Sequence, residues 1–234
     1  FDYRAPKGTI DVLVYDRTGK LIQQQPVLCE DWHLSYPYVF EQGGETYMLP
    51  EASASGRLTL YRAKAFPLEW EKVEAFDFRE AAIDATPFHY AERWWMFWTP
   101  AGTRDERQSA LHISVSDGLT GPCTHLGLFL SDRAGARPGG TPVVVDGELF
   151  LPTQDCRDTY GQGIRLLKIE GLERGLPKVT PSDVLDAPAV LRRRFPDGFH
   201  TLSAAGQVTL VDVKRVGIGP RRDIMNVKRR LGLG

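Results

Sequence analysis

A short pattern recurs along this chain, and it restricts the fold more than any other feature. Each copy holds a strand that begins with small polar residues, then a turn, then a second strand. The first copy covers residues 33–51, the second begins at Asp84, and the third begins at Gly140. Recurrence of one strand pair at this spacing predicts a repeat architecture rather than a sheet wrapped by helices.

Prolines near the start of each copy serve as register marks. Pro37 and Pro87 are 50 residues apart, and Pro87 and Pro142 are 55 residues apart. This spacing suits a four-stranded propeller blade of about 40 to 50 residues with loop insertions. A fourth unit begins near Gly198, and residues 9–23 form an opening hairpin that supplies a fifth unit when the chain ends pair.

The sequence therefore predicts an all-β fold, a five-bladed β-propeller that occupies residues 1–220 as a single domain. A basic tail follows at residues 221–234, with a short helix at residues 223–230. A two-sheet β-sandwich is the alternative, because it uses the same short strands. A sandwich gives no reason for the polar start to recur in successive units, and the near absence of long helical patterns argues against an α/β fold.

Composition limits the classes of function. The chain has 234 residues, of which 42% are apolar, and its formal net charge of -1 gives no general attraction to nucleic acid or to an anionic membrane. A charged ligand must therefore be bound locally. Neither an apolar run long enough to span a membrane nor a signal peptide is visible. Cys29, Cys123 and Cys156 lack the spacing of a metal site, and unpaired thiols without a signal peptide favour a cytoplasmic location.

Polar residues at the starts of the repeated units are the candidates for a binding site. In a propeller the first strand of each blade lines the central channel, so these residues approach one axis from distant parts of the chain. Ends of the neighbouring second strands add further side chains. The predicted substrate-binding residues are His33, Ser35, Tyr36, Thr86, Trp98, Thr141, Gln154, His200 and Thr201.

Three carboxylates, Glu51, Asp84 and Asp155, are the predicted catalytic residues. Carboxylates and amides hydrogen-bond sugar hydroxyls, while aromatic rings cover the apolar face of a sugar, so the set suits a polyhydroxylated ligand. If the site hydrolyses a glycosidic bond, Glu51 is the general acid, and Asp84 or Asp155 is the base or the charge that tunes it. No cofactor is predicted; a channel-bound cation such as Ca²⁺, held by carboxylates with His200, is an alternative without an EF-hand loop to support it.

Several of these residues also have a purely structural interpretation. Asp84 and Thr86 are typical residues for capping the turn before a strand. Glu51 follows a proline and is also explained as a solvated loop carboxylate. His33 and His200 are equally well explained as structural histidines.

Two further segments have competing interpretations. The run from Trp94 to Trp98 is better explained by packing between blades than by a sugar platform, because alternate residues of a strand face opposite sides of its sheet. The basic patch at Arg192–Arg194 is usually a solvated surface, and a phosphate contact is the alternative.

Residues 44–49, which read G-x-x-Y-x-L, resemble the five-bladed propellers of glycoside hydrolase family 43. Most of residues 30–215 resembles more closely the propeller-like N-terminal domain of plant glucosamine inositolphosphorylceramide transferases and its bacterial relatives. The residues that carry this resemblance are His33 to Pro37, Pro50, Glu51, Asp84 to Thr86, Gly139 to Pro142, Gln154 to Cys156, Tyr160, Gly161 and Gly198 to Ser203.

This resemblance implies a propeller with a role linked to carbohydrate. In the plant proteins the glycosyltransferase catalytic part is a separate domain, which implies an accessory role. Where family 43 carries its base aspartate, just before the first proline, this chain has Ser35 and Tyr36. Two hypotheses follow: a carbohydrate-active propeller that binds a glycan and, if catalytic, hydrolyses it; or a non-catalytic binding module that serves a carbohydrate-modifying enzyme.

Overall fold

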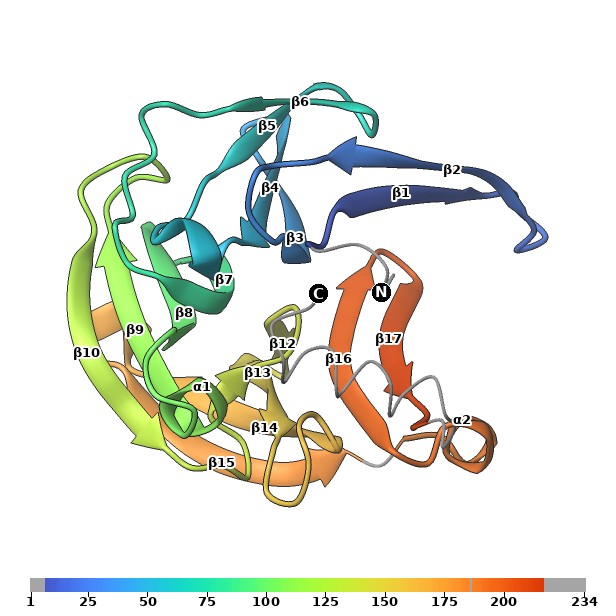
Figure 1. Ribbon diagram of the computed structural model, residues 1–234. Coiled ribbons are helices and arrows are strands. Elements are labelled where there is room, and N and C mark those ends of the chain that lie inside the picture. The colour runs from blue at the N-terminus through green and yellow to red at the C-terminus, as the bar shows by residue number, and fades with distance from the viewer. Residues whose placement is uncertain (1–6, 186, 217–234) are drawn as a thin grey trace, which may run out of the picture.

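The computed structural model describes residues 7–185 and 187–216 as five sheets arranged around a common centre (Figure 1). Three sheets contain four-stranded meanders, whose last strands lie at the periphery, and the other two are hairpins. The prediction of an all-β propeller is confirmed, and the circular arrangement differs from the two layers of a sandwich. The blade count of five stays a prediction, because two of the sheets have only two strands each.

The sheets follow one another in chain order. The opening hairpin and the first four-stranded sheet consist of β1 (Ile10–Tyr15) and β2 (Leu21–Leu28), then β3 (Ser35–Gln42), β4 (Glu45–Glu51), β5 (Tyr61–Ala65) and β6 (Glu69–Lys72). The second four-stranded sheet consists of β7 (Ala82–Tyr90), β8 (Arg93–Pro100), β9 (Ala110–Ser116) and β10 (Thr124–Ser131).

In the third large sheet the first strand is interrupted, and its two pieces both pair with the same neighbour. This sheet and the final hairpin consist of β11 (Arg137–Pro138), β12 (Val143–Val145), β13 (Glu148–Asp155), β14 (Gly163–Glu170) and β15 (Lys178–Leu185), then β16 (Gly198–Ala205) and β17 (Val208–Lys214). Helical elements are short: α1 (Glu106–Ser109), α2 (Ala189–Arg194), and the 3₁₀ turns η1 (Ser53–Ser55) and η2 (Leu172–Arg174). Within the described ranges, no helix is long and apolar enough to cross a membrane.

Hydrophobic clusters lie between consecutive sheets, and β8 shows how the sequence builds two of them. Trp95 and Phe97 point to the cluster shared with the third large sheet, whereas Met96 and Trp98 point to the cluster shared with the first. Because successive side chains of a strand face opposite sides, a strand packed on both faces is apolar throughout. The aromatic run is therefore packing between sheets, as the structural interpretation of the sequence predicts.

Bulges interrupt the first strands where they face the centre. Two residues of β3, Tyr36 and Pro37, lie opposite a single residue of β4, and Asp84 and Ala85 of β7 lie opposite one residue of β8. The expected proline register is therefore wrong by two residues, because Pro37 corresponds to Ala85 and not to Pro87. Tyr36 and Asp84 have φ angles of 43° and 47°, which aim their side chains differently from those of a regular strand.

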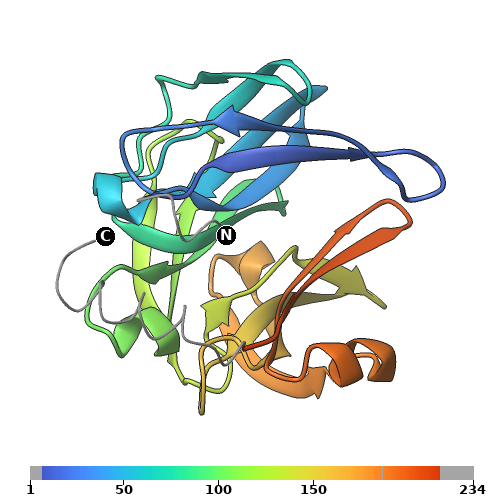
Figure 2. The same ribbon diagram turned by 45° about the vertical axis from the view of Figure 1, so that its right-hand side comes forward.

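The two hairpins lie next to each other in the circle of sheets (Figures 1 and 2). The expected pairing of the chain ends is not observed within the described residues, because β1–β2 and β16–β17 form separate sheets. A parallel bridge between Gly140 and Leu202 instead connects the final hairpin to the third large sheet. The predicted tail helix lies outside the described residues, and the single-domain boundary at residue 220 stays a prediction.

Replacing Gly140 tests this connection. Its φ angle is 150°, and a Cβ atom there would lie 1.8 Å from the Leu202 carbonyl oxygen. We expect Gly140→Ala to lower the free energy of unfolding by about 3 kcal/mol, because a strained backbone is combined with a backbone clash. Gly147→Ala is the matched control: its φ angle is 79°, no atom lies within 4 Å of the added Cβ, and the cost is about 1 kcal/mol. If urea denaturation shows equal losses of unfolding free energy for Gly140→Ala and Gly147→Ala, the close approach of Gly140 to Leu202 is contradicted.

Candidate functional site

A buried ion pair joins the second and third large sheets at the centre. Arg137 Nε of β11 donates to Asp84 Oδ2 of β7 at 2.6 Å, and the two side chains are only 11% and 4% exposed. Arg137 Nη1 also donates to the Arg107 carbonyl oxygen at 3.0 Å. Burial acts to lower the pKa of Arg137, but the Asp84 carboxylate outweighs it, so the pKa is raised and the guanidinium stays charged.

Gln154 completes the surroundings of Asp84. Its Nε2 donates to Asp84 Oδ2 at 2.6 Å and to the Pro138 carbonyl oxygen at 2.8 Å. Both partners are acceptors, which fixes the orientation of the amide. The Gln154 Oε1 atom is buried and has no hydrogen-bond partner among the described residues. A buried amide oxygen therefore retains unused acceptor capacity beside the ion pair.

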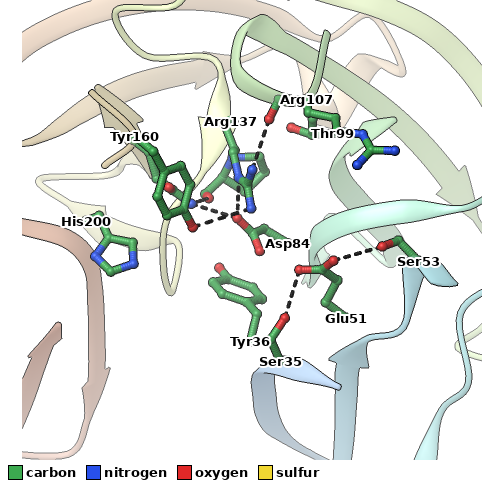
Figure 3. Close-up of polar contacts among 12 residues, drawn as sticks. Ser35, Tyr36, Glu51, Ser53, Asp84, Thr99, Arg107, Arg137, Tyr160 and His200 are labelled. Atoms are coloured by element: carbon green, nitrogen blue, oxygen red, sulfur yellow. Dashed lines mark hydrogen bonds and ion pairs between the residues drawn. The ribbon is translucent and has the colours of Figure 1, made fainter. Parts of the chain in front are cut away.

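Glu51 lies on the other side of Asp84, at the end of β4 (Figure 3). Ser35 donates to its Oε2 and Ser53 to its Oε1, each at 2.9 Å. Burial raises the pKa of Glu51, and the Asp84 carboxylate raises it further, which outweighs the opposing effects of Arg137 and the two serines. The carboxyl group is thus held in place by two hydroxyls and has no ion-pair partner in the described part of the chain.

Two tyrosines border the same space. The Tyr36 hydroxyl is 3.0 Å from Thr86 Oγ1, and Thr86 in turn donates to the Asp84 carbonyl oxygen at 3.2 Å. Tyr160, in the loop after β13, lies with its ring centroid 4.8 Å from the Arg137 guanidinium carbon, in cation–π contact. Its side of the site is open, because 39% of Tyr160 is exposed.

His200 of β16 adds an imidazole from the fourth part of the chain. Its ring packs edge-on against Tyr160, with centroids 5.3 Å apart, and its Nε2 is 3.4 Å from Asp212 Oδ2. Burial lowers the pKa of His200 more than the Asp212 charge raises it, so the ring is neutral at pH 7. With the proton on Nε2 facing Asp212, the buried Nδ1, which has no hydrogen-bond partner in the described part of the chain, is an acceptor.

The structure thus brings together Ser35, Tyr36, Glu51, Asp84, Thr86, Gln154 and His200, as the sequence predicts, but it does not bring Asp155 to them. Asp155 follows Gln154 on β13 and faces the opposite side of the strand. Its carboxylate binds Arg157 through Nε and through Nη2 at 2.7 Å. Burial acts to raise the pKa of Asp155, but these contacts with Arg157 outweigh it, and the pKa is lowered. Asp155 lines a separate cavity of about 220 Å³ beside α2.

Four other predicted binding residues are occupied elsewhere or lie at the margin. His33 Nδ1 accepts a hydrogen bond from the Gly8 amide at 2.8 Å, and Trp98 is 4% exposed with its indole N–H bonded to Ser114 Oγ at 2.9 Å. Both side chains are explained by structure, so we leave them out of the proposed site. Thr141 and Thr201 are partly buried, one hydrogen-bonded to Leu202 through its amide and the other paired with Asp212 across the hairpin.

Sequence reasoning missed Arg137, Tyr160 and Ser53. Tyr160 belongs to the residues that carry the family resemblance, but nothing in its spacing indicates that the loop folds back over the centre. Arg137 directly precedes the Pro138-Gly139-Gly140 interruption of the first strand, which is the one local signal that could have identified it. Among residues 7–185 and 187–216, no group of three or more His, Cys, Asp or Glu side chains is arranged to hold a metal ion.

Comparison with known protein families identifies the chain. The family model described as glucosamine inositolphosphorylceramide transferase 1, N-terminal, matches residues 5–179. The chain belongs to this family. The rice protein glucosamine inositolphosphorylceramide transferase 1 (Oryza sativa subsp. indica) is 36% identical over 206 residues, and the Arabidopsis thaliana protein of the same name is 38% identical over 152 residues. These matches cover 82% and 63% of this chain but only 27% and 20% of the relatives.

Solved structures of family-43 glycoside hydrolases share the fold. The Bacillus subtilis arabinanase superposes with a TM-score of 0.53 at 14% identity, over 76% of this chain and 64% of its own. Sequence identity at this level shows a common fold and nothing about the reaction. The chain therefore combines a propeller fold shared with family-43 glycoside hydrolases with the sequence of the transferase N-terminal family.

The dependence of Asp84 on Arg137 can be measured with a double-mutant cycle. We expect Arg137→Gln to lower the free energy of unfolding by about 3 kcal/mol, because it leaves a buried carboxylate without its cation. The double variant Arg137→Gln/Asp84→Asn should lose about 1 to 2 kcal/mol less unfolding free energy than the sum of the losses of the two single variants. Arg79→Gln, which breaks an exposed ion pair with Asp77, is the control and leaves stability nearly unchanged. If urea denaturation shows that the double variant loses as much stability as the two single variants together, Asp84 and Arg137 are not directly coupled.

Proposed function

We propose that the central site binds a sugar, or a sugar conjugate, that carries an amino group. The observation behind this proposal is the excess of acceptors: the unused hydrogen-bonding atoms are Gln154 Oε1, His200 Nδ1 and the remaining lone pairs of Glu51. Two carboxylates, Glu51 and Asp84, also lie near one guanidinium, that of Arg137, which forms its ion pair with Asp84. A ligand ammonium group supplies three donors and one positive charge, which suits both features.

Sugar recognition is supported by the other groups at the site. Each Glu51 oxygen accepts one serine hydroxyl and keeps a position for a ligand hydroxyl. Tyr36 provides a ring for the apolar side of a pyranose, whereas the Tyr160 ring is already in cation–π contact with Arg137. The relatives are named for glucosamine, an amino sugar, which agrees with the chemistry of the site.

We infer that the domain binds its ligand without hydrolysing it and serves a carbohydrate-processing enzyme. Asp84 Oδ2 is held by both Arg137 and Gln154, and Asp155 faces a different cavity. Neither carboxylate is therefore free to act as a base beside Glu51. Glycoside hydrolysis is the second candidate, favoured by the raised pKa of Glu51, which suits a general acid.

Glu51→Gln tests the charge contribution. Isothermal titration with glucosamine and with glucose, its neutral counterpart, should show that the wild-type protein prefers glucosamine by about tenfold, as expected for a charge-assisted hydrogen bond. The variant should lose this preference while its affinity for glucose stays within about twofold, because glutamine keeps the shape and removes the charge. A wild-type protein that binds both sugars equally well would overturn the assignment of an amino sugar.

The affinity for glucosamine should also depend on pH. An ammonium group binds the ionised carboxylate, so affinity rises as the pH increases through the pKa of Glu51, which lies above its ordinary value of 4.5. Titrations across this range should show the rise in the wild-type protein and a flat profile in Glu51→Gln. A rise that persists in the variant would assign the titration to another group.

Activity assays on the wild-type protein and on Glu51→Gln distinguish binding from catalysis. A panel of aryl glycosides should show no turnover by the wild-type chain at any pH at which glucosamine binds. Turnover that is abolished in Glu51→Gln would instead establish the hydrolase. Absence of both sugar binding and turnover would remove the central site as a carbohydrate site.

A further inference from the structure

The short helix α2 places three consecutive arginines on the outer rim, away from the central site (Figure 1). Arg192, Arg193 and Arg194 are all exposed, and within the described residues Arg193 and Arg194 form no ion pair with a carboxylate. Val190, in the same helix, is 73% exposed. An exposed apolar side chain beside unpaired arginines is the combination that interfacial helices use at a lipid surface.

The end of β17 extends this basic surface. The Asp197 amide donates to the Lys214 carbonyl oxygen at 3.1 Å, and the Val216 amide donates to Asp197 Oδ2 at 2.7 Å, which places this strand end beside the residues that follow α2. Arg215 is exposed there, and Val216 is 41% exposed.

The whole chain has a formal net charge of -1, so this concentration of cations is local. Clusters of several Lys and Arg residues bind anionic lipid headgroups through electrostatic attraction. Nucleic acid and acidic polysaccharide attract the same charges, but they offer no hydrocarbon layer for Val190 and Val216. The exposed valines therefore favour a membrane surface over the other polyanions.

We propose that α2 and the adjoining end of β17 form a docking surface for an anionic membrane. This surface lies on the outer rim, and Lys214, at the end of β17, connects it to the loop of the central site, because its Nζ donates to the Tyr160 carbonyl oxygen. It adds to the proposed sugar-binding function a means of holding the domain at a lipid surface. Arg193 and Arg194 supply attraction to the headgroups, while Val190 enters the boundary between headgroups and acyl chains. The side chains of the central site take no part in it.

Vesicle flotation with the full 234-residue chain tests the proposal. The protein should float with vesicles made of equal amounts of phosphatidylcholine and phosphatidylglycerol, but not with phosphatidylcholine alone. Binding should be lost at about 1 M NaCl, where the screening length falls to about 3 Å. Arg193→Gln/Arg194→Gln should weaken binding about thirtyfold, since each basic residue near the surface contributes about 1 kcal/mol. Val190→Ser should weaken binding about threefold and leave its salt dependence unchanged.

Arg17→Gln/Lys20→Gln is the matched control, because it removes two exposed charges from the turn of the first hairpin. It should bind anionic vesicles as the wild-type protein does. The proposal is overturned if anionic vesicles do not bind, if neutral vesicles bind equally well, or if this control loses as much affinity as the α2 variant. Binding to heparin or a DNA duplex with no binding to vesicles would assign the surface to a different polyanion. Glucosamine titration of the α2 variants reports on the central site independently.

Discussion

The buried contact between Asp84 and Arg137 is the interaction on which the central site depends. It is formed by two different sheets, and neither side chain is exposed enough for water to replace its partner. Removing two charges from water costs several kcal/mol per ion unless the geometry is good and other hydrogen bonds are satisfied. Gln154, the Arg107 carbonyl group and the Tyr160 ring meet this requirement together. The neighbouring sheets are thereby held at a fixed separation, which orients the more open residues around them.

Electrostatics at the centre and at the rim are opposite in sign. The centre presents carboxylates, an amide oxygen and a neutral imidazole nitrogen, all of which accept hydrogen bonds. The rim at α2 presents arginines and exposed valines. A chain with nearly balanced total charge thus separates hydrogen-bond acceptors and cations in space, so its overall charge predicts neither of the two proposed binding surfaces.

The fold was predictable from the sequence because periodic features determine it, whereas the site was predictable only in part. The recurrent polar start of each unit singled out Tyr36, Asp84 and His200, and the structure places these three residues around the centre, although their role in binding stays a prediction. Proline spacing failed as a register, because a bulge shifts strand pairing without leaving a mark in the sequence. Asp155 was predicted because it lies at the end of a second strand, as Gln154 does, yet adjacent strand residues face opposite sides. Arg137 was missed because its partner is 53 residues away in the chain.

The bulges at Tyr36 and Asp84 separate the conformation of the backbone from the chemistry of the side chain. At both positions the backbone adopts a left-handed conformation and the flanking strand pairing resumes on either side. One accommodates a phenol and the other a carboxylate, so the backbone irregularity does not depend on the chemistry of the side chain. At each of these residues the backbone atoms form the bulge, whereas the side-chain atoms make the contacts at the central site. Tyr36 is therefore the better of the two positions for altering the proposed specificity, because Asp84 is held in a buried ion pair with Arg137.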